Sequence, residues 1–436
     1  MDRSVSELQQ SLRSVAKADR ARRFHSLYDK LYREDVLREA WHHVRANKGA
    51  SGIDGIGIED VEKQEGGEQA FLGQIAKELK EHKYTPSPSK RVWIPKPNGK
   101  QRPLSIPTLK DRIVQTAAVL ILQPIFEQDF EPNSYGFREG KSTHDAVREV
   151  VKWLNFGYEN VIDADISSCF DSIPKNLLMK QFARRVVDGS VLSLVKQWLN
   201  AGILDGGVNV DSGEQGVAQG SPISPLLANV FLDQLDKAWN ESGMTSRVGA
   251  HLVRYADDFV VLGRSRRAMK EEALGVLDKI ITSIGLSLNK DKTRLVEAGK
   301  KGEGFDFLGF HFVRYYSKRR GKKVTWWLPS AKSEGSIRQR IKQLTNKSNL
   351  ATMTPYDAKE KVVEALKGWG EYFKHSMATL SFSQIWDYAN MRLGRMRRRW
   401  HQKQHYIGRY KERLHKGLSV LNTKIKAVPY AYDATL

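Results

Sequence analysis

The chain has 436 residues, 40% of them hydrophobic, and its 71 Lys and Arg against 50 Asp and Glu give a formal net charge of +21. This hydrophobic share can bury cores, which excludes global disorder, and the length predicts two to four domains. No segment approaches the roughly 18 apolar residues of a membrane span, and residues 1–30 are polar and Arg-rich, so no secretory signal is expected. The single cysteine, Cys169, excludes internal disulfides and Cys-based zinc sites. We therefore expect a soluble, cytoplasmic protein that makes no contact with a membrane.

Most of the charge excess lies near the C-terminal end of the sequence. Residues 1–310 carry 44 basic and 42 acidic side chains, a net charge of +2, whereas residues 311–436 carry 27 and 8, a net charge of +19. A solvated basic surface is the simplest interpretation of a run of charge. An asymmetry of this length, interleaved with Trp and Tyr, instead favours binding to a polyanion such as nucleic acid.

The first third of the chain predicts helices around one β-hairpin. Apolar residues recur at helical spacing over residues 6–47, and the glycine-rich stretch 47–57 ends that helix in a loop. A further helix is predicted over Glu68–His82. Prolines then exclude helix, so Arg91–Ile106 predicts a hairpin whose tip is Pro97-Asn98-Gly99. Helix resumes over Lys110–Phe126.

The middle of the chain places acidic residues in strands. The β-branched run Val161–Ile166 predicts a buried strand with carboxylates near its end, and His251–Leu262 predicts two strands that meet at a tight turn. The other predicted elements are helices that begin near Pro174 and near Pro222 and Pro225, an amphipathic helix over Arg266–Ile284, and short strands over 305–313 and 324–328.

After Pro329 the pattern is wholly helical. Thr354 and Pro355 predict a helix start, with Thr354 as the cap and Pro355 as the first helical residue. The next helix turns Ile385, Ala389, Met396 and Trp400 inward and leaves arginines on another face. The domain boundary is therefore expected at about residues 314–330.

Asp165 at the end of one predicted strand and the pair Asp257-Asp258 at the tip of a hairpin are the candidate catalytic residues. Neighbouring strands of one sheet can bring them together, and convergent carboxylates repel unless they share a proton or bind cations. Oxygen ligands suit Mg²⁺, and two such ions support in-line phosphoryl transfer, which is polymerase chemistry. A surface turn is the simpler interpretation of an Asp-Asp pair, but the apolar runs on both sides disfavour it.

Five segments carry a resemblance to a known family. They read VIDADISSCFDSI from Val161, AQGSPISPLLAN from Ala218, YADD from Tyr255, LNKDKT from Leu288 and FLGF from Phe307. Their order and spacing resemble the motifs of a group II intron-type reverse transcriptase that lacks an endonuclease. The blocks Arg102–Pro107 and Asn133–Arg138 resemble its fingers, and the resemblance extends from about Ala46 to His375.

The resemblance implies an α+β right-hand polymerase with fingers, a ferredoxin-like palm and an all-helical thumb or maturase domain. It implies an N-terminal extension with a template-contacting loop over residues 1–60, fingers over 61–160, and the palm, with part of the fingers, over 161–313. The helical thumb and maturase (X) domain is expected over 314–402 and a short basic nucleic-acid-binding segment over 403–436. No endonuclease domain is expected, so the protein is not expected to nick its own DNA target.

By the same resemblance, Asp165, Asp257 and Asp258 are the catalytic acids. Two Mg²⁺ ions are expected on Asp165, Asp257 and the backbone carbonyl of Ile166. Asp163 falls outside the matched position and is expected to be structural or secondary.

The dNTP substrate is expected to contact Lys96, Arg102, Phe170 and Gln219. Lys96 and Arg102 match the pair that holds the triphosphate, and Gln219 matches a residue near the sugar and base. Phe170 matches the aromatic gate that excludes a ribose 2′-hydroxyl, although a core aromatic is its simpler interpretation. Where many family members have Pro-Gln-Gly-Gly, this chain has Ala-Gln-Gly-Ser from Ala218, which can alter the nucleotide pocket.

The nucleic-acid contacts implied by the resemblance lie further along the chain. They are a primer grip at Phe307, Leu308 and Gly309, and nucleic-acid-binding residues at Lys292, Arg392, Arg395 and Arg399.

The implied function is an RNA-directed DNA polymerase that extends a DNA or RNA primer on an RNA template and binds its group II intron RNA to promote splicing and mobility. Two alternatives stay open: a domesticated reverse transcriptase in repair or defence, and a binding-only splicing maturase, against which the intact acids argue. The resemblance implies a bacterial cytoplasmic protein that associates with the nucleoid when it binds DNA.

Overall fold

The computed structural model describes residues 4–95, 101–210 and 213–421. The chain forms two compact units: the first contains the residues up to Leu308 together with Phe312–Thr325, and the second contains Gly309–His311 and the residues from Trp326 onward. Within the described ranges, no helix is long and apolar enough to cross a membrane.

The chain begins with short helices: α1 (Val5–Ala18), α2 (Tyr28–Leu31), α3 (Glu34–Ala46), α4 (Ile58–Lys63) and α5 (Gly67–Lys80). The continuous helix predicted over residues 6–47 is wrong, because the backbone of Phe24 makes a strand-like bridge instead. Its N–H donates to the Arg185 carbonyl at 2.8 Å, and its own carbonyl accepts from Val187 at 2.9 Å. The predicted loop over residues 47–57 and the helix over α5 are confirmed.

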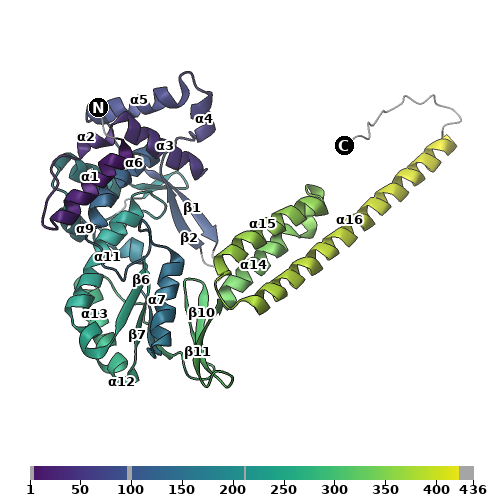
Figure 1. The fold of residues 1–436 in the computed structure, drawn as a ribbon. Helices are drawn as coiled ribbons and strands as arrows, with labels where there is room; N and C mark the ends of the chain where they lie inside the picture. Colours follow the sequence, from purple (N-terminus) through teal and green to yellow (C-terminus); the bar gives the residue numbers. More distant parts are fainter. Residues whose placement is uncertain (1–3, 96–100, 211–212, 422–436) are drawn as a thin grey trace. The chain divides into compact units, whose positions relative to one another are not determined.

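The predicted hairpin forms from β1 (Ser89–Pro95) and β2 (Gln101–Ile106), which pair antiparallel; its predicted tip lies outside the described residues. The sheet continues with β4 (Ile203–Asp205) and β5 (Val208–Val210) in the order β2-β1-β4-β5. Helices α6 (Leu109–Phe126) and α7 (Thr143–Asn155) follow the hairpin, as Figure 1 shows.

A second four-stranded sheet holds the acidic residues. It consists of β3 (Asn160–Asp165), β6 (His251–Tyr255), β7 (Asp258–Gly263) and β8 (Arg294–Glu297), all antiparallel, in the order β6-β7-β3-β8. Its connecting helices are α8 (Cys169–Ser172), α9 (Lys175–Phe182), α10 (Gly189–Asn200), α11 (Ser224–Glu241), α12 (Arg266–Ala268) and α13 (Leu274–Ser283), with π-helical turns at Met244–Val248 and Met269–Ala273. Pro174 caps α9 and is not its first helical residue.

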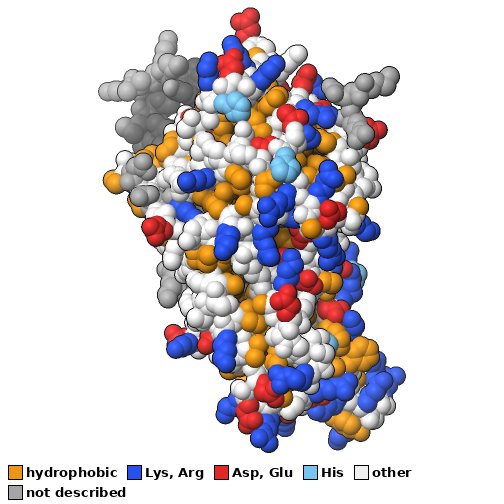
Figure 2. Space-filling model, turned by 90° about the vertical axis from the view of Figure 1, so that its left-hand side faces the viewer, with side chains coloured by type: hydrophobic (Ala, Val, Ile, Leu, Met, Phe, Trp, Pro, Cys, Tyr) orange, Lys and Arg blue, Asp and Glu red, His pale blue; other side chains and the backbone are white. Residues whose placement is uncertain are grey.

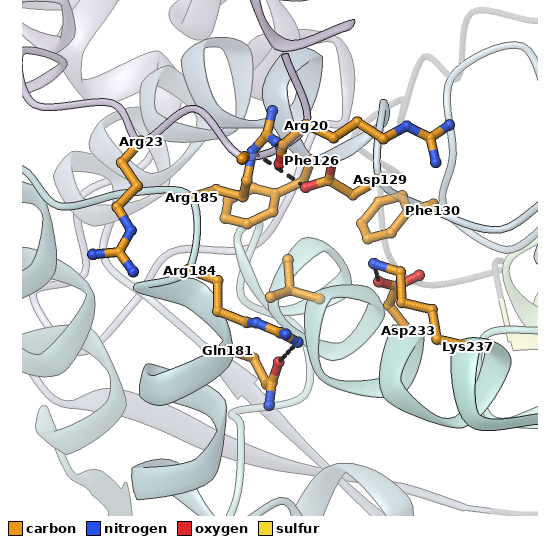
Figure 3. A pocket seen from close by; sticks show the side chains of 12 residues that line it. Arg20, Arg23, Phe126, Asp129, Phe130, Gln181, Arg184, Arg185, Asp233 and Lys237 are labelled. Carbon is orange, nitrogen blue, oxygen red and sulfur yellow. Dashed lines mark hydrogen bonds and ion pairs between the residues drawn. The ribbon is translucent and has the colours of Figure 1, made fainter. Parts of the chain in front are cut away.

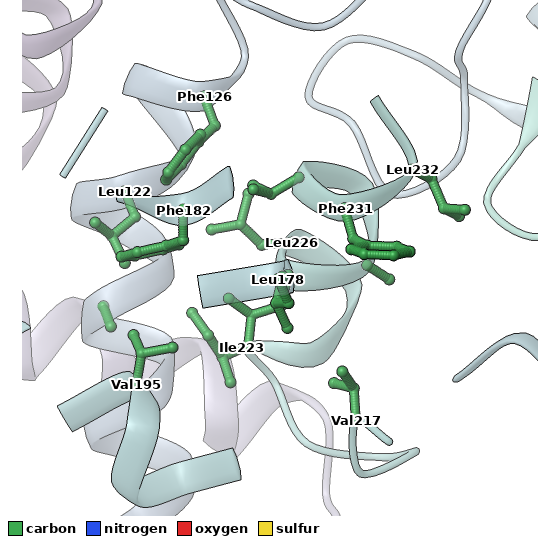
Figure 4. Packing of buried hydrophobic residues seen from close by; sticks show 14 of the residues in the cluster. Leu122, Phe126, Leu178, Phe182, Val195, Val217, Ile223, Leu226, Phe231 and Leu232 are labelled. Carbon is green, nitrogen blue, oxygen red and sulfur yellow. The ribbon is translucent and has the colours of Figure 1, made fainter. Parts of the chain in front are cut away.

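One hydrophobic core joins these helices and the sheet. Figure 4 shows Phe126 of α6, Phe182 of α9 and Phe231 of α11 among the aliphatic side chains of this core. The rings of Phe126 and Phe182 have centroids 5.1 Å apart. Because the helices before and after the acidic strand share this core, the ends of β3 and β7 rest on a rigid base.

The strand predicted over residues 305–313 is two strands, β9 (Phe305–Phe307) and β10 (Phe310–Ser317), followed by β11 (Lys322–Pro329) in a sheet of order β11-β10-β9. The break occurs because Leu308 and Gly309 take φ values of 52° and 79°, in the left-handed region that no β-strand contains.

The second unit is helical after β11, as predicted. It contains α14 (Ala331–Leu344), a 3-10 turn at Lys347–Ala351, α15 (Pro355–Phe373) and α16 (Thr379–Leu421). The predicted start of α15 is confirmed, because the Thr354 side chain accepts a hydrogen bond from the Asp357 N–H at 3.2 Å and Pro355 is the first helical residue. Its core gathers Ile337, Ile341, Val362, Ile385 and Ala389.

Candidate active site

Three carboxylates lie at one end of the acidic sheet. Asp165 is the last residue of β3 and pairs across the ladder with Asp258, the first residue of β7. Asp257 lies in the two-residue turn between β6 and β7, beside Ala256, whose φ of 57° is left-handed. The sheet therefore brings Asp165 close to Asp257 and Asp258, although more than ninety positions separate Asp165 from this pair in the sequence.

The electrostatics of this end show mutual repulsion. Burial raises the pKa of the Asp258 carboxyl to about 7, and the charges of Asp163 and Asp257 add to the rise. Burial also raises the pKa of Asp257, and the charge of Asp165 contributes. Because each carboxylate opposes ionisation of the next, a cation at this end would stabilise all of them.

Two basic side chains neutralise part of this negative charge. The Lys292 Nζ lies 2.5 Å from Asp165 Oδ2, and Arg294 Nη2 lies 2.9 Å from Asp163 Oδ2. Burial raises the pKa of Asp163, while Arg294 lowers it and the charge of Asp306 raises it again. Lys292 and its partner are both solvent-exposed enough for the ion pair to exchange with another cation.

The donor set fits a hard divalent cation. Within the described residues, no three His, Cys, Asp or Glu side chains lie together in an arrangement that could by itself hold a metal ion. The acids nevertheless offer only oxygen ligands, as Mg²⁺ prefers. Ile166 adds a backbone carbonyl. The hydrogen bonds that flank its bridge to Leu288 run from the Asn289 N–H to the Asp165 carbonyl and from the Ser167 N–H to the Ser287 carbonyl, so the Ile166 C=O lies outside that ladder. The repulsion among the half-buried acids supports the same conclusion.

The helical turn α8 connects the acids to the glycine-containing segment before α11. Phe170 is 9% exposed and belongs to the core, so little of its side chain is accessible. Its carbonyl accepts a hydrogen bond from the Val217 N–H at 2.7 Å, and the Ile173 carbonyl accepts from Gly216 at 2.9 Å. These two backbone hydrogen bonds hold the backbone at Phe170 beside the segment that leads to Gln219.

Arg102 and Gln219 are in direct contact. The Arg102 Nε donates to the Gln219 Oε1 at 2.8 Å, and the Ser105 N–H donates to the Gln219 carbonyl at 2.7 Å. Gly220 has a φ of 107°, and a Cβ there would lie 2.6 Å from the Ser105 carbonyl oxygen, so only glycine allows this approach. Lys96, the predicted partner of Arg102, lies outside the described residues.

The comparisons with known proteins agree with this geometry. The profile of the family described as reverse transcriptase (RNA-dependent DNA polymerase) matches residues 94–312. The chain belongs to the reverse transcriptase family. The profile described as group II intron, maturase-specific domain matches residues 335–416, so this reverse transcriptase also carries a maturase-specific domain. The predicted fold class, family and polymerase activity are confirmed.

Two bacterial relatives illustrate the relationship, and one solved structure aligns with the chain without bearing on it. Protein YkfC of Escherichia coli K12 is 35% identical over 366 residues, which cover 76% of this chain and 93% of YkfC. The group II intron-encoded protein LtrA of Lactococcus lactis subsp. cremoris is 35% identical over 215 residues, 49% of this chain but only 35% of LtrA. Among solved structures, telomerase from Candida albicans aligns with a TM-score of 0.43 and 14% identity, over 79% of this chain and 64% of that one.

The turn that carries Asp257 is held by a buried arginine, Arg254, which the sequence pattern did not single out. Arg254 is 0% exposed; its Nε donates to both oxygens of Asp236 at 2.9 and 3.0 Å, and its Nη1 donates to the Ala256 carbonyl at 2.9 Å. Gly136 packs so close that a Cβ there would lie 2.4 Å from the Ala256 nitrogen. A charged residue inside an otherwise apolar strand was the available signal, because buried arginines need partners.

One of the predicted primer-grip residues, Leu308, contacts an acid. Phe307 is 1% exposed, and the Leu308 backbone N–H donates a hydrogen bond to the Asp258 carboxyl, which opposes the rise in the pKa of that group. In the second unit, the Gly309 carbonyl accepts hydrogen bonds from the Ser330 N–H at 2.9 Å and the Ser333 hydroxyl at 2.8 Å.

The predicted nucleic-acid-binding arginines of α16 differ in their surroundings. Arg392 donates to the Thr345 hydroxyl at 3.0 Å and to the Lys342 carbonyl at 3.3 Å, and so satisfies the end of α14. Arg395 and Arg399 are exposed. The side chains of Arg395 and Arg399 are thus accessible to a polyanion, whereas that of Arg392 is engaged within the unit.

Proposed function

We propose that this reverse transcriptase extends a DNA or RNA primer on an RNA template, with Asp165, Asp257 and Asp258 as its catalytic acids. The observation that carries the proposal is the end of the acidic sheet, where half-buried carboxylates repel one another, which raises the pKa values of Asp257 and Asp258 and favours a bound cation. A structural acidic turn would gain nothing from this repulsion.

Asp165, Asp257 and the Ile166 carbonyl would hold two Mg²⁺ ions. Bound there, the metal would favour ionisation of the primer hydroxyl and stabilise charge on the leaving phosphate. Arg102, held by Gln219 at 2.8 Å, would contact the triphosphate of the dNTP together with Lys96. Phe170 would present its ring edge to the sugar. Lys292 would leave Asp165 when the carboxylate binds metal and would then be available to a phosphate.

The substrate and partner assignments extend the family match. The maturase-specific profile and the group II intron-encoded relative support binding of a group II intron RNA, with a role in splicing and mobility. We further propose the division into an N-terminal extension, fingers, palm, thumb and basic segment with the boundaries given above. Bacterial relatives support a bacterial origin. We also propose a cytoplasmic location, on RNA and on nucleoid DNA.

The test is primer extension by Asp257→Asn. The variant removes one carboxylate charge and keeps the side-chain shape, so RNA binding should stay unchanged while extension with dNTPs and Mg²⁺ falls by about 100-fold or more. The matched control is Asp278→Asn, an exposed aspartate of α13. Extension by Asp257→Asn at the wild-type rate would refute the assignment of the acids.

A further inference from the structure

A pocket lies in the first unit, away from the proposed catalytic acids, between elements that the proposed chemistry does not use. It has a volume of about 410 Å³ and is enclosed by the link between α1 and α2, the residues that follow α6 and α9, and one face of α11. Pockets of roughly 300–1,000 Å³ hold small molecules. Lys and Arg side chains lie close together around the middle of the face drawn in Figure 2.

The rim of this pocket is cationic. Two of its five basic side chains have carboxylate partners, since Arg185 Nε lies 3.3 Å from Asp129 Oδ2 and Lys237 Nζ lies 2.5 Å from Asp233 Oδ2. The other three are Arg20, Arg23 and Arg184, which are exposed and have no carboxylate partner among the described residues. Arg184 Nη1 also donates to Gln181 Oε1 at 3.0 Å. Figure 3 shows that Arg20 extends toward Phe130, away from Arg23. The exposed guanidinium groups of Arg23 and Arg184 are therefore the ones suited to a phosphate in the hollow.

The floor offers the opposite chemistry. Asp233 is 7% exposed, and while its Oδ2 pairs with Lys237, its buried Oδ1 has no hydrogen-bond partner in the protein. A buried acceptor of this kind is rare and is stabilised by a donor. Burial raises the pKa of Asp233 to about 6, as expected for a carboxylate with too few donors. Phe126, Phe130 and Val230 form an apolar wall beside it, and Figure 3 shows Arg23 and Arg184 on one side and Phe130, Asp233 and Lys237 on the other.

A ligand must satisfy both parts. An inorganic anion would pair with the arginines but would leave the Asp233 oxygen without a donor, and a metal cation would satisfy the floor but be repelled by the rim. A nucleotide carries a phosphate at one end and, on cytosine, an exocyclic amino group that aspartate accepts. Uracil places a carbonyl oxygen at the same position, which a carboxylate repels.

We propose that this pocket binds a single nucleotide, with its phosphate on the rim at Arg23 and Arg184 and the amino group of its base at Asp233. The same chemistry is offered by a free nucleotide and by an unstacked nucleotide of a single-stranded RNA. The proposal does not depend on the polymerase site.

The test is calorimetric titration of the full chain with CMP, UMP and inorganic phosphate in EDTA, which removes the metal that the polymerase site needs. CMP should bind about 10-fold more tightly than UMP or phosphate. The triple variant Arg20→Ala/Arg23→Ala/Arg184→Ala should lose at least about 10-fold in CMP affinity. The control triple Arg148→Ala/Arg247→Ala/Arg267→Ala removes arginines whose side chains are 70%, 63% and 85% exposed elsewhere in the unit, and it should bind CMP as the wild type does.

Asp233→Asn tests the floor separately. It should bind phosphate as before and lose the preference for CMP over UMP. Equal binding of CMP and UMP by the wild type, or wild-type CMP affinity in the rim variant, would overturn the proposal. If Asp233→Asn does not fold, the rim variant still tests the proposal, because its three substituted residues are exposed and their loss should not unfold the protein. Binding of cytidylate decamers distinguishes a nucleotide of RNA from a free nucleotide. Reduced decamer binding by the rim variant identifies an RNA nucleotide as the ligand, and unchanged decamer binding identifies a free nucleotide.

Discussion

Replacing the buried arginine behind the catalytic turn should damage stability and catalysis by separable routes. Arg254→Met removes the donors to Asp236, which is itself 0% exposed, and to the carbonyl of Ala256, the residue before Asp257. Breaking a buried ion pair by removing one partner costs about 3–5 kcal/mol, and the lost bond to the carbonyl adds about 1 kcal/mol. Urea denaturation should therefore show a free energy of unfolding lower by about 4 kcal/mol or more.

The double variant Arg254→Met/Asp236→Leu distinguishes the two routes. Since it removes both charges, it should regain most of the lost stability. It still leaves Ala256 without its donor at 2.9 Å, so the turn that carries Asp257 is no longer held. A displacement of about 1 Å at a reacting group can cost about 100-fold in rate. Primer extension by the folded double variant should therefore stay far below the wild-type rate.

The control is Arg267→Met, whose side chain is 85% exposed and pairs with Glu271 on the surface. It should change the free energy of unfolding by less than about 0.5 kcal/mol. A loss below about 1 kcal/mol in Arg254→Met would show that the ion pair does not support the fold. Full recovery of primer extension in the double variant would show that Arg254 does not position the turn.

Three further outcomes are expected. Phe170→Val should increase incorporation of ribonucleotides in primer extension, and an unchanged ratio of rNTP to dNTP use would leave Phe170 as a core residue only. The pair Arg395→Ala/Arg399→Ala should weaken RNA binding and reduce the slope of log affinity against log salt by about 2. An unaltered slope would show that both arginines are solvated surface residues that do not contact RNA. Asp188→Ala should lower the free energy of unfolding by about 1–2 kcal/mol at pH 7. Burial alone would raise the pKa of the Asp188 carboxyl, but hydrogen bonds from the N–H groups of Leu27, Tyr28, Ser190 and Val191 outweigh it and lower the pKa. The stabilisation is therefore present above the unfolded pKa of about 4 and should disappear as the pH falls through the folded value, which equilibrium denaturation at several pH values would show.

The positions of the acids could be predicted because local patterns determine them. β3 and the turn between β6 and β7 each follow from a few consecutive residues, and only one pairing, Asp165 with Asp258, was needed to bring the acids together. The break after α1 could not be predicted in this way. It depends on a bridge between Phe24 and Val186, two segments that the sequence separates by more than 160 positions. A helical pattern near residue 24 contains no information about that partner.

The same limit applies to charge. The net charge of +2 over residues 1–310 predicts that acidic and basic side chains balance in this part of the chain, but in the structure the balance is made of particular pairs. Arg254 with Asp236 and Arg185 with Asp129 are buried, and Lys292 with Asp165 is exposed enough to exchange. A buried pair supports the fold, whereas an exposed pair such as Lys292 with Asp165 would release its carboxylate to a metal ion under the proposed function. Exposed guanidinium groups without carboxylate partners, such as Arg23 and Arg184, are what a phosphate can use, and they occur in residues 1–310, whose net charge is almost zero. Net charge therefore indicates that a polyanion is bound, whereas the pairing of each side chain decides where.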